Sequence, residues 1–187
     1  MNFVEPIKSI EDIAAMKSYL RSRCLRDALL FTLGINSALR ISDLLALTVE
    51  DVDGKDRINV TEAKTGKTKS MPWSPNCISA INEYLTSIDV RSGSLFPSRK
   101  GGSTITRQHA YKVINDAARA AGVITEKNCV LIGSHSLRKT FAYHAYNNGT
   151  SIEVIQKILN HSSSATSLAY IGITKQTVDD VYISLNL

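Results

Sequence analysis

Residues 135–171 read HSLRKTFAYHAYNNGTSIEVIQKILNHSSSATSLAYI. Gly149 is a stop signal for a helix over residues 136–148, and Thr150 with Glu153 forms a T-x-x-E box that opens a second helix over 151–159. Two short motifs within this stretch, HSLRKT (135–140) and LNHSSSATSLAYI (159–171), carry two imidazoles, one guanidinium and one phenol, each beside small or hydroxyl side chains. Four such groups in so short a segment favour a chemical role over chance placement on helix surfaces.

The preceding sequence predicts further helices and one hairpin. Ser9 and Asp12 give a start like a capping box for a first helix. Residues 57–63 and 67–73 are two short β-type runs around the turn Thr65-Gly66-Lys67. The other predicted helices cover residues 26–38, 41–48, 74–88 (opened by Pro75) and 106–121 (stopped by Gly122). The predicted fold class is therefore mainly α with one small antiparallel β-hairpin, and no linker divides residues 1–187 into two domains.

Composition indicates the cellular compartment of the protein and the kind of partner that it binds. Three cysteines without C-x-x-C spacing argue against a disulfide framework or a zinc ribbon. With neither a signal segment nor a membrane-length apolar run, the sequence favours a cytoplasmic protein that does not bind a membrane. Net charge is +5, and residues 98–144 hold eight Lys/Arg against two acids. This favours a polyanion partner, nucleic acid first, although a solvated basic face is equally common on composition alone.

Six side chains make up the candidate catalytic set: Arg40, Lys64, His135, Arg138, His161 and Tyr170. The acids near them, Asp43 and Glu62, match no metal loop, so a two-metal nuclease is poorly supported, and no metal or other cofactor and no small-molecule substrate is expected.

Phosphoryl transfer explains the chemistry of such a set. Two guanidinium groups can clamp one phosphodiester and oppose its growing charge. A phenol has a pKa of about 10, but nearby cations favour the phenolate and an imidazole can accept its proton. The same cations ease proton loss from a lysine amine, which suits a general acid for a departing alkoxide.

At these positions the sequence resembles the tyrosine recombinase (phage integrase) family. The resemblance spans nearly the whole chain, through ALRISDLLALTVEDVD (38–53), AKTGKTKSMPW (63–73) and residues 135–171. It implies the DNA breaking-rejoining catalytic fold, and a covalent 3′-phosphotyrosine with a free 5′-hydroxyl. Asn160 stands where the family usually has Gly, and Asp43 where Glu is commoner; neither change removes a catalytic group.

The resemblance also implies a role for each side chain. Tyr170 would be the nucleophile and His135 the acceptor of its proton. Arg40 and Arg138 would clamp the phosphate, and His161 would donate a hydrogen bond to it. Lys64 would be the general acid, although Lys67 and Lys69 lie on the same hairpin and could also reach the DNA. Tyr182, the rival nucleophile, falls in the apolar stripe Val178, Val181, Tyr182 and Leu185, which is typical of a docking face.

Assembly and DNA contact follow as further expectations. The resemblance implies that residues 175–187 are a C-terminal docking tail that joins subunits into a tetramer on double-stranded DNA. The N-terminal clamp domain found in most members is expected to be absent from residues 1–187, because the catalytic pattern begins almost at Met1. The chain therefore resembles either the catalytic half of a longer protein or a short single-domain recombinase. Contacts to the DNA backbone are expected from Lys67, Lys69, Arg107, Lys112, Arg119 and Lys139, with the three on residues 106–121 forming one face.

The sequence therefore predicts a site-specific DNA recombinase that needs no metal. Two alternatives stay open: relaxation of supercoils by the same chemistry, as in a type IB topoisomerase, and a DNA-binding regulator that keeps the fold without catalysis.

Overall fold

The computed structural model describes residues 4–88, 91–99, 101, 103–125, 130–172 and 183. Its helices and strands, in chain order, are α1 (Ile10–Arg23), α2 (Leu25–Ser37), α3 (Ile41–Leu45), α4 (Val49–Val52), β1 (Arg57–Thr61), β2 (Thr68–Pro72), α5 (Pro75–Ser87), α6 (Arg107–Ala120), α7 (Ser134–Asn147), α8 (Ile152–Leu159) and α9 (Ser164–Ile171). The predicted class, mainly α with an antiparallel hairpin, is confirmed.

Local chemistry explains most of the boundaries. Side-chain oxygens of Ser9, Ser74 and Thr106 accept hydrogen bonds from the first turns of α1, α5 and α6. Pro75 occupies the first turn of α5, where its missing N–H costs nothing. These starts were predicted from the sequence, and the structure confirms them.

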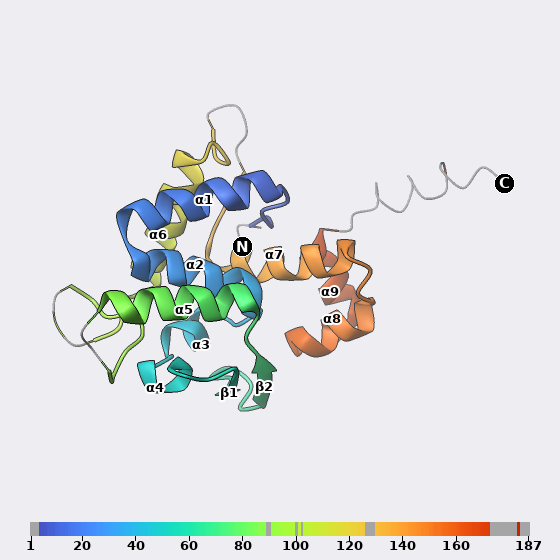
Figure 1. The fold of residues 1–187 in the computed structure, drawn as a ribbon. Coiled ribbons are helices and arrows are strands. Elements are labelled where there is room, and N and C mark those ends of the chain that lie inside the picture. The colour runs from blue at the N-terminus through green and yellow to red at the C-terminus, as the bar shows by residue number, and fades with distance from the viewer. Residues whose placement is uncertain are drawn as a thin grey trace.

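Helix α2 is the centre of the molecule. Leu29, Leu30, Phe31 and Leu33 lie on different sides of it and all are buried. A helix that is apolar on every side must be covered on every side. Helices α1, α5 and α7 pack against α2 and supply this cover. Figure 1 shows α1, α2 and α5 running beside one another.

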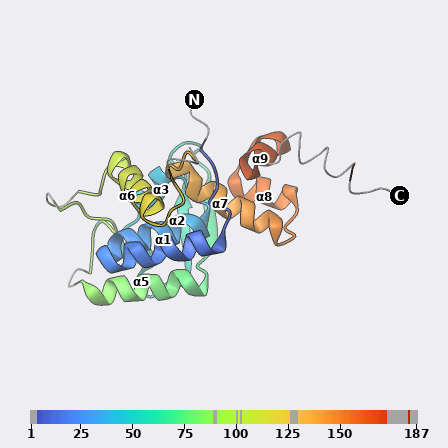
Figure 2. The ribbon, with the colours of Figure 1, turned by 90° about the horizontal axis from the view of Figure 1, so that it is seen from above.

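Two further groups of elements lie at the edges of this centre. The β1–β2 hairpin is antiparallel, with Arg57 opposite Pro72 and Thr61 opposite Thr68. Helices α8 and α9 pack on the C-terminal half of α7 and form a separate apolar cluster with Ala38. Figure 2 shows α8 and α9 gathered beside α7 at one side of the molecule. The C-terminal end of α2 therefore lies where the central helices, the β1–β2 hairpin and the α8–α9 pair meet.

The structure differs from the sequence-based expectation in small ways. The helix predicted over residues 41–48 ends at Leu45 as α3, and a second short helix, α4, was not predicted; it begins after Thr48 because Thr48 and Asp51 make a capping box. Ser151, and not Thr150, occupies the N-cap position of α8, so the predicted box is off by one residue. Helix α9, which carries Tyr170, was not predicted. Within the described part of the chain, no helix is long and apolar enough to cross a membrane.

Candidate active site

The guanidinium of Arg138 joins the ends of two helices. Its Nη1 donates to the carbonyl of Ala38, at the end of α2, and its Nη2 donates to the carbonyl of Leu159, the last residue of α8. Both helices end in a left-handed residue, Ala38 with φ 55° and Asn160 with φ 50°. The last carbonyls of a helix have no partner within it and carry partial negative charge, so a buried cation is stabilised between two such ends. Arg138 is 2 % exposed.

Lys69 bridges the same two helix ends. Its Nζ donates to the carbonyls of Ser37 at 3.4 Å and Ile158 at 3.2 Å, one residue before each carbonyl that Arg138 contacts. Burial, and then the charge of Arg138, lower the pKa of Lys69 to about 8. The sequence assigned this lysine to DNA backbone contact, but its amine is directed into the protein.

Arg40 forms an ion pair with Glu62. Arg40 precedes α3, and its Nη1 lies 2.6 Å from Oε2 of Glu62. The Glu62 side chain is 0 % exposed, whereas that of Arg40 is 17 % exposed. Burial acts to raise the pKa of Glu62, but the hydrogen bond from Thr65 and the pairing with Arg40 outweigh it, so the pKa lies below its ordinary value. Glu62 thus stays charged and fixes the guanidinium of Arg40.

Asp43 ties α3 to the hairpin. It is 3 % exposed, and its Oδ1 accepts from the backbone N–H of Ala63 at 3.1 Å. Ala63 follows Glu62 directly, so Asp43 and Arg40 together hold the residues just after β1. The carboxylate of Asp43 therefore has a structural role, because it connects α3 to the residues that follow β1.

Helix α9 places Tyr170 beside His161. Their rings meet edge to face with centroids 4.9 Å apart. Burial raises the pKa of Tyr170 above its ordinary value, and the charges of Arg138 and Arg40 offset this only in part. The expectation that nearby cations would favour the phenolate is therefore not met in the DNA-free protein, because loss of solvent outweighs the cations.

His161 is a neutral imidazole at pH 7. Burial, and then Arg138 and Arg40, lower its pKa to about 4. Its Nδ1 lies 3.0 Å from Oγ of Ser167, one helical turn before Tyr170. A neutral imidazole has one N–H and one acceptor nitrogen, so its role depends on which nitrogen holds the hydrogen.

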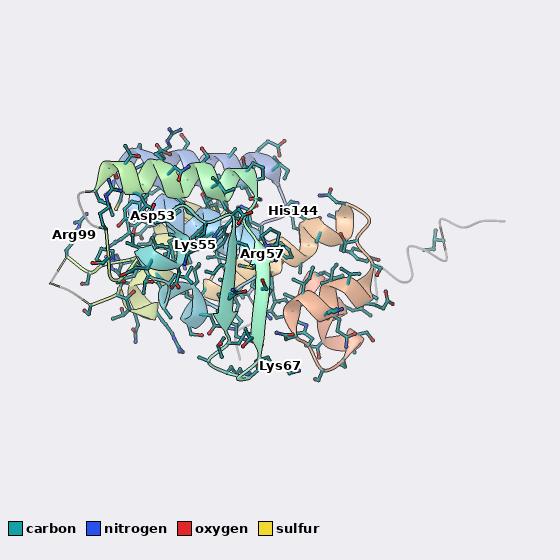
Figure 3. All side chains as sticks on the ribbon, turned by 60° about the horizontal axis from the view of Figure 1, so that its bottom comes forward. Asp53, Lys55, Arg57, Lys67, Arg99 and His144 are labelled. Atoms are coloured by element: carbon teal, nitrogen blue, oxygen red, sulfur yellow. The ribbon has the colours of Figure 1, made fainter. Side chains whose placement is uncertain are left out.

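His135 and Lys64 lie at the open side of the site. His135 is in the first turn of α7, three residues before Arg138, and retains an exposed surface. Desolvation of its ring, and then the charges of Arg138 and Lys139, lower its pKa, and Lys64 contributes to the same shift. Lys64 itself is exposed in the hairpin turn. Figure 3 shows its neighbour Lys67 at the hairpin tip, away from Arg57.

Two expectations about DNA contact are corrected by the structure. Lys139 is 5 % exposed, and its Nζ lies 5.2 Å from the centroid of the Tyr170 ring, so it is a buried neighbour of the phenol and not a surface cation. Arg107, Lys112 and Arg119 are all exposed on α6. At about 100° per residue, Lys112 and Arg119 share one side of α6 while Arg107 lies on another, so the three do not form a single face.

Five of the six predicted groups are linked by contacts or charge in one region: Arg40, His135, Arg138, His161 and Tyr170. Lys64 is nearby but exposed. Ser167 beside His161 was missed, and two residues named from the sequence were not given the contacts that they make: Glu62 as partner of Arg40, and half-buried Lys69 at the two helix ends. Only Lys69 carried a usable signal. Side chains alternate along a strand, so Lys69 shares the inward side of β2 with Met71.

Comparisons with known proteins agree with this geometry. The model of the phage integrase family matches residues 7–177. The chain is 42 % identical over 183 residues to the probable integrase/recombinase YoeC of Bacillus subtilis (strain 168), with 97 % of each covered. It is 31 % identical over 168 residues to tyrosine recombinase XerD of Mycobacterium leprae (strain TN), covering 84 % of this chain and 51 % of that protein. It thus spans nearly all of YoeC but about half of XerD.

Solved structures share the fold. XerA recombinase superposes with a TM-score of 0.78 at 24 % identity, covering 100 % of this chain and 67 % of that one. XerH recombinase, in a post-cleavage complex with its palindromic difH substrate, gives a TM-score of 0.71 at 22 % identity, with 97 % and 53 % covered. The catalytic domain of bacteriophage HP1 integrase gives 0.62 at 20 % identity, with 98 % and 96 % covered.

Proposed function

The chain belongs to the phage integrase family, and we propose that it is a site-specific DNA recombinase whose Tyr170 forms a covalent 3′-phosphotyrosine. One observation carries the proposal: the Tyr170 phenol lies in the field of Arg138 and Arg40, with the His161 ring against its own. Two guanidinium groups around one phenol are the charges that an attacked phosphodiester requires.

The cleavage step balances within this set of groups. Oη of Tyr170 attacks phosphorus, the P–Oη bond forms and the bond from phosphorus to the 5′-oxygen breaks. The phenolic proton passes to His135, which is neutral at pH 7 because its pKa is lowered. The departing 5′-oxygen takes a proton from a lysine. A 5′-hydroxyl of the second DNA reverses these transfers and rejoins the strand. The phosphotyrosine conserves the bond energy, so the proposed reaction needs no ATP and assigns no role to a metal ion.

Lys64 is the proposed proton donor to the 5′-oxygen, since the exposed hairpin turn can move onto bound DNA. Lys69 is its competitor, because its buried amine has a pKa of about 8 and lies close to Arg138. A substrate with sulfur in place of the bridging 5′-oxygen separates them, because a thiolate leaves without needing a proton. Replacing the true donor by alanine slows cleavage of the oxygen substrate but not of the sulfur substrate. Replacing a lysine with a structural role slows both.

A suicide substrate, nicked so that the released 5′-end diffuses away, tests the function itself. The wild-type protein should accumulate a covalent protein–DNA adduct that resists denaturation. Tyr170→Phe should form none, because phenylalanine has no nucleophilic oxygen. Tyr182→Phe is the matched control and should retain the adduct, although Tyr182 lies outside the described residues.

The same assay distinguishes the alternative functions. Absence of any adduct from the wild-type protein would favour a non-catalytic DNA-binding regulator. An adduct with relaxation of supercoiled DNA, but no exchange between two sites, would favour a topoisomerase-like enzyme.

Assembly on DNA is part of the proposal. We expect a tetramer on two double-stranded sites, joined by residues 175–187, which lie outside the described residues apart from Ile183. Deleting residues 175–187 should leave the fold and single-site cleavage intact while impairing coordinated exchange. Normal recombination by the truncated protein would disprove the role of the tail.

A further inference from the structure

Ser167 lies in the sequence between His161, which stands in the connection before α9, and Tyr170, which lies on α9. It follows His161 by six residues and precedes Tyr170 by three, so it shares a side of α9 with Tyr170. The residue is 0 % exposed. Its Oγ lies 3.0 Å from Nδ1 of His161. A hydroxyl buried this completely must find its hydrogen-bond partners within the protein.

The direction of this hydrogen bond follows from the partners available. A serine hydroxyl has one hydrogen to donate, and leaving it buried without an acceptor costs about 1–3 kcal/mol. Among the described residues, Nδ1 of His161 is the hydrogen-bond partner found for Ser167 Oγ. The hydroxyl therefore donates to Nδ1. Because the imidazole is neutral at pH 7, its single hydrogen then resides on Nε2.

We propose that Ser167 is a positioning residue that holds His161 in the Nε2–H tautomer and fixes the orientation of its ring against Tyr170. This inference rests on the proposed function. In this tautomer the free side of the imidazole is a hydrogen-bond donor, suited to a non-bridging phosphate oxygen. It cannot accept the phenolic proton at Nε2, so that proton goes to His135. Ser167 thereby separates the tasks of the two histidines.

The tautomer is measured directly in the free protein. Long-range ¹⁵N–¹H correlation spectra of ¹⁵N-labelled protein at pH 7 distinguish the two nitrogens of each histidine ring. We expect the hydrogen of His161 on Nε2, and a shift of the Nδ1 resonance in Ser167→Ala as the hydrogen bond is lost. A hydrogen on Nδ1 in the wild-type protein overturns the proposal. This readout needs no DNA, so it is independent of whether the chain is a recombinase.

A double-mutant cycle tests the role in cleavage. Loss of the hydrogen-bond partner of a metal-bound histidine costs roughly 10- to 100-fold in affinity or activity. We expect a loss of the same order in the rate of adduct formation for Ser167→Ala, and recovery of the rate in Ser167→Thr. In a His161→Ala background, Ser167→Ala should add nothing, because the serine acts through the imidazole. Ser164→Ala, an exposed change on the same helix, is the control and should leave the rate unchanged. Equal losses in both backgrounds would overturn the proposal. If the wild-type protein forms no adduct, the proposed function fails, while the spectra still decide the tautomer.

Discussion

Glu62→Gln removes one charge from the interior and leaves its shape almost unchanged. The carboxylate is fully buried, lies 2.6 Å from Arg40 Nη1 and accepts from Thr65 Oγ1 at 2.7 Å. Removing one partner of a buried ion pair costs about 3–5 kcal/mol. The amide oxygen can still accept both hydrogen bonds, and the Arg40 side chain is 17 % exposed. The loss of stability should therefore be smaller than for a fully buried ion pair. We expect the variant to be less stable by about 2–3 kcal/mol at pH 7.

Urea denaturation as a function of pH checks both the magnitude and its cause. The pKa of Glu62 in the folded protein is below its ordinary value, so its contribution to stability is fully present above the unfolded pKa of about 4.3. That contribution is lost as pH falls through the folded pKa. The stability difference between wild type and Glu62→Gln should therefore be constant above about pH 5 and shrink in more acidic solution.

Glu153→Gln is the matched control, because this glutamate is exposed at the start of α8. The free energy of unfolding of this variant should equal that of the wild type within the error of the measurement. A Glu62→Gln variant as stable as wild type at pH 7, or a difference that does not vary with pH, would refute the view that the charge of Glu62 fixes Arg40.

Three other predictions concern packing, backbone and DNA. At Gly34 on α2, an added Cβ would lie 2.4 Å from Leu137 Cδ1 and 3.2 Å from Leu137 Cβ. Rotation of the Leu137 side chain relieves only the first of these contacts. In Gly34→Ala, the cost of overpacking, about 1–3 kcal/mol, should therefore exceed the gain in helix propensity of about 1 kcal/mol. Thermal denaturation should show a lower midpoint, and an unchanged or higher one would mean that α7 yields freely. Asn160→Gly and Asn160→Ala both lose the side-chain amide, so the difference between their free energies of unfolding measures the cost of a left-handed backbone at φ 50°. Urea denaturation should find the glycine variant more stable by about 1 kcal/mol. Equal stability would show that the backbone at residue 160 relaxes out of the left-handed region. DNA affinity should fall steeply with salt. Replacing Lys112 and Arg119, which share one side of α6, together by Gln should reduce the slope of log affinity against log salt by about 2. An unchanged slope in fluorescence anisotropy titrations would place this side of α6 away from the DNA.

Local sequence signals determined most of the helices and the hairpin of this protein, but not α4 or α9. Caps such as Ser9, Ser74 and Thr106 act within one helical turn, and the Thr65–Lys67 turn acts between adjacent strands, so neighbouring residues suffice to predict them. The spacing of His161 and Tyr170 likewise belongs to one short segment. The pattern of Arg, Lys, His-x-x-Arg, His and Tyr also gave the family without coordinates.

Tertiary structure alone decided what each group in the site contacts. Arg138 meets Ala38 across a separation of 100 residues and Lys69 meets Ile158 across 89, and no local pattern records which helix ends will converge. The same convergence buries Lys139 and partly buries Tyr170. Desolvation, which depends on the packing of distant segments, therefore raises the pKa of the phenol. Residue types and spacing supply the chemical groups, while their protonation and partners depend on the solvent and charge that the folded chain leaves around them.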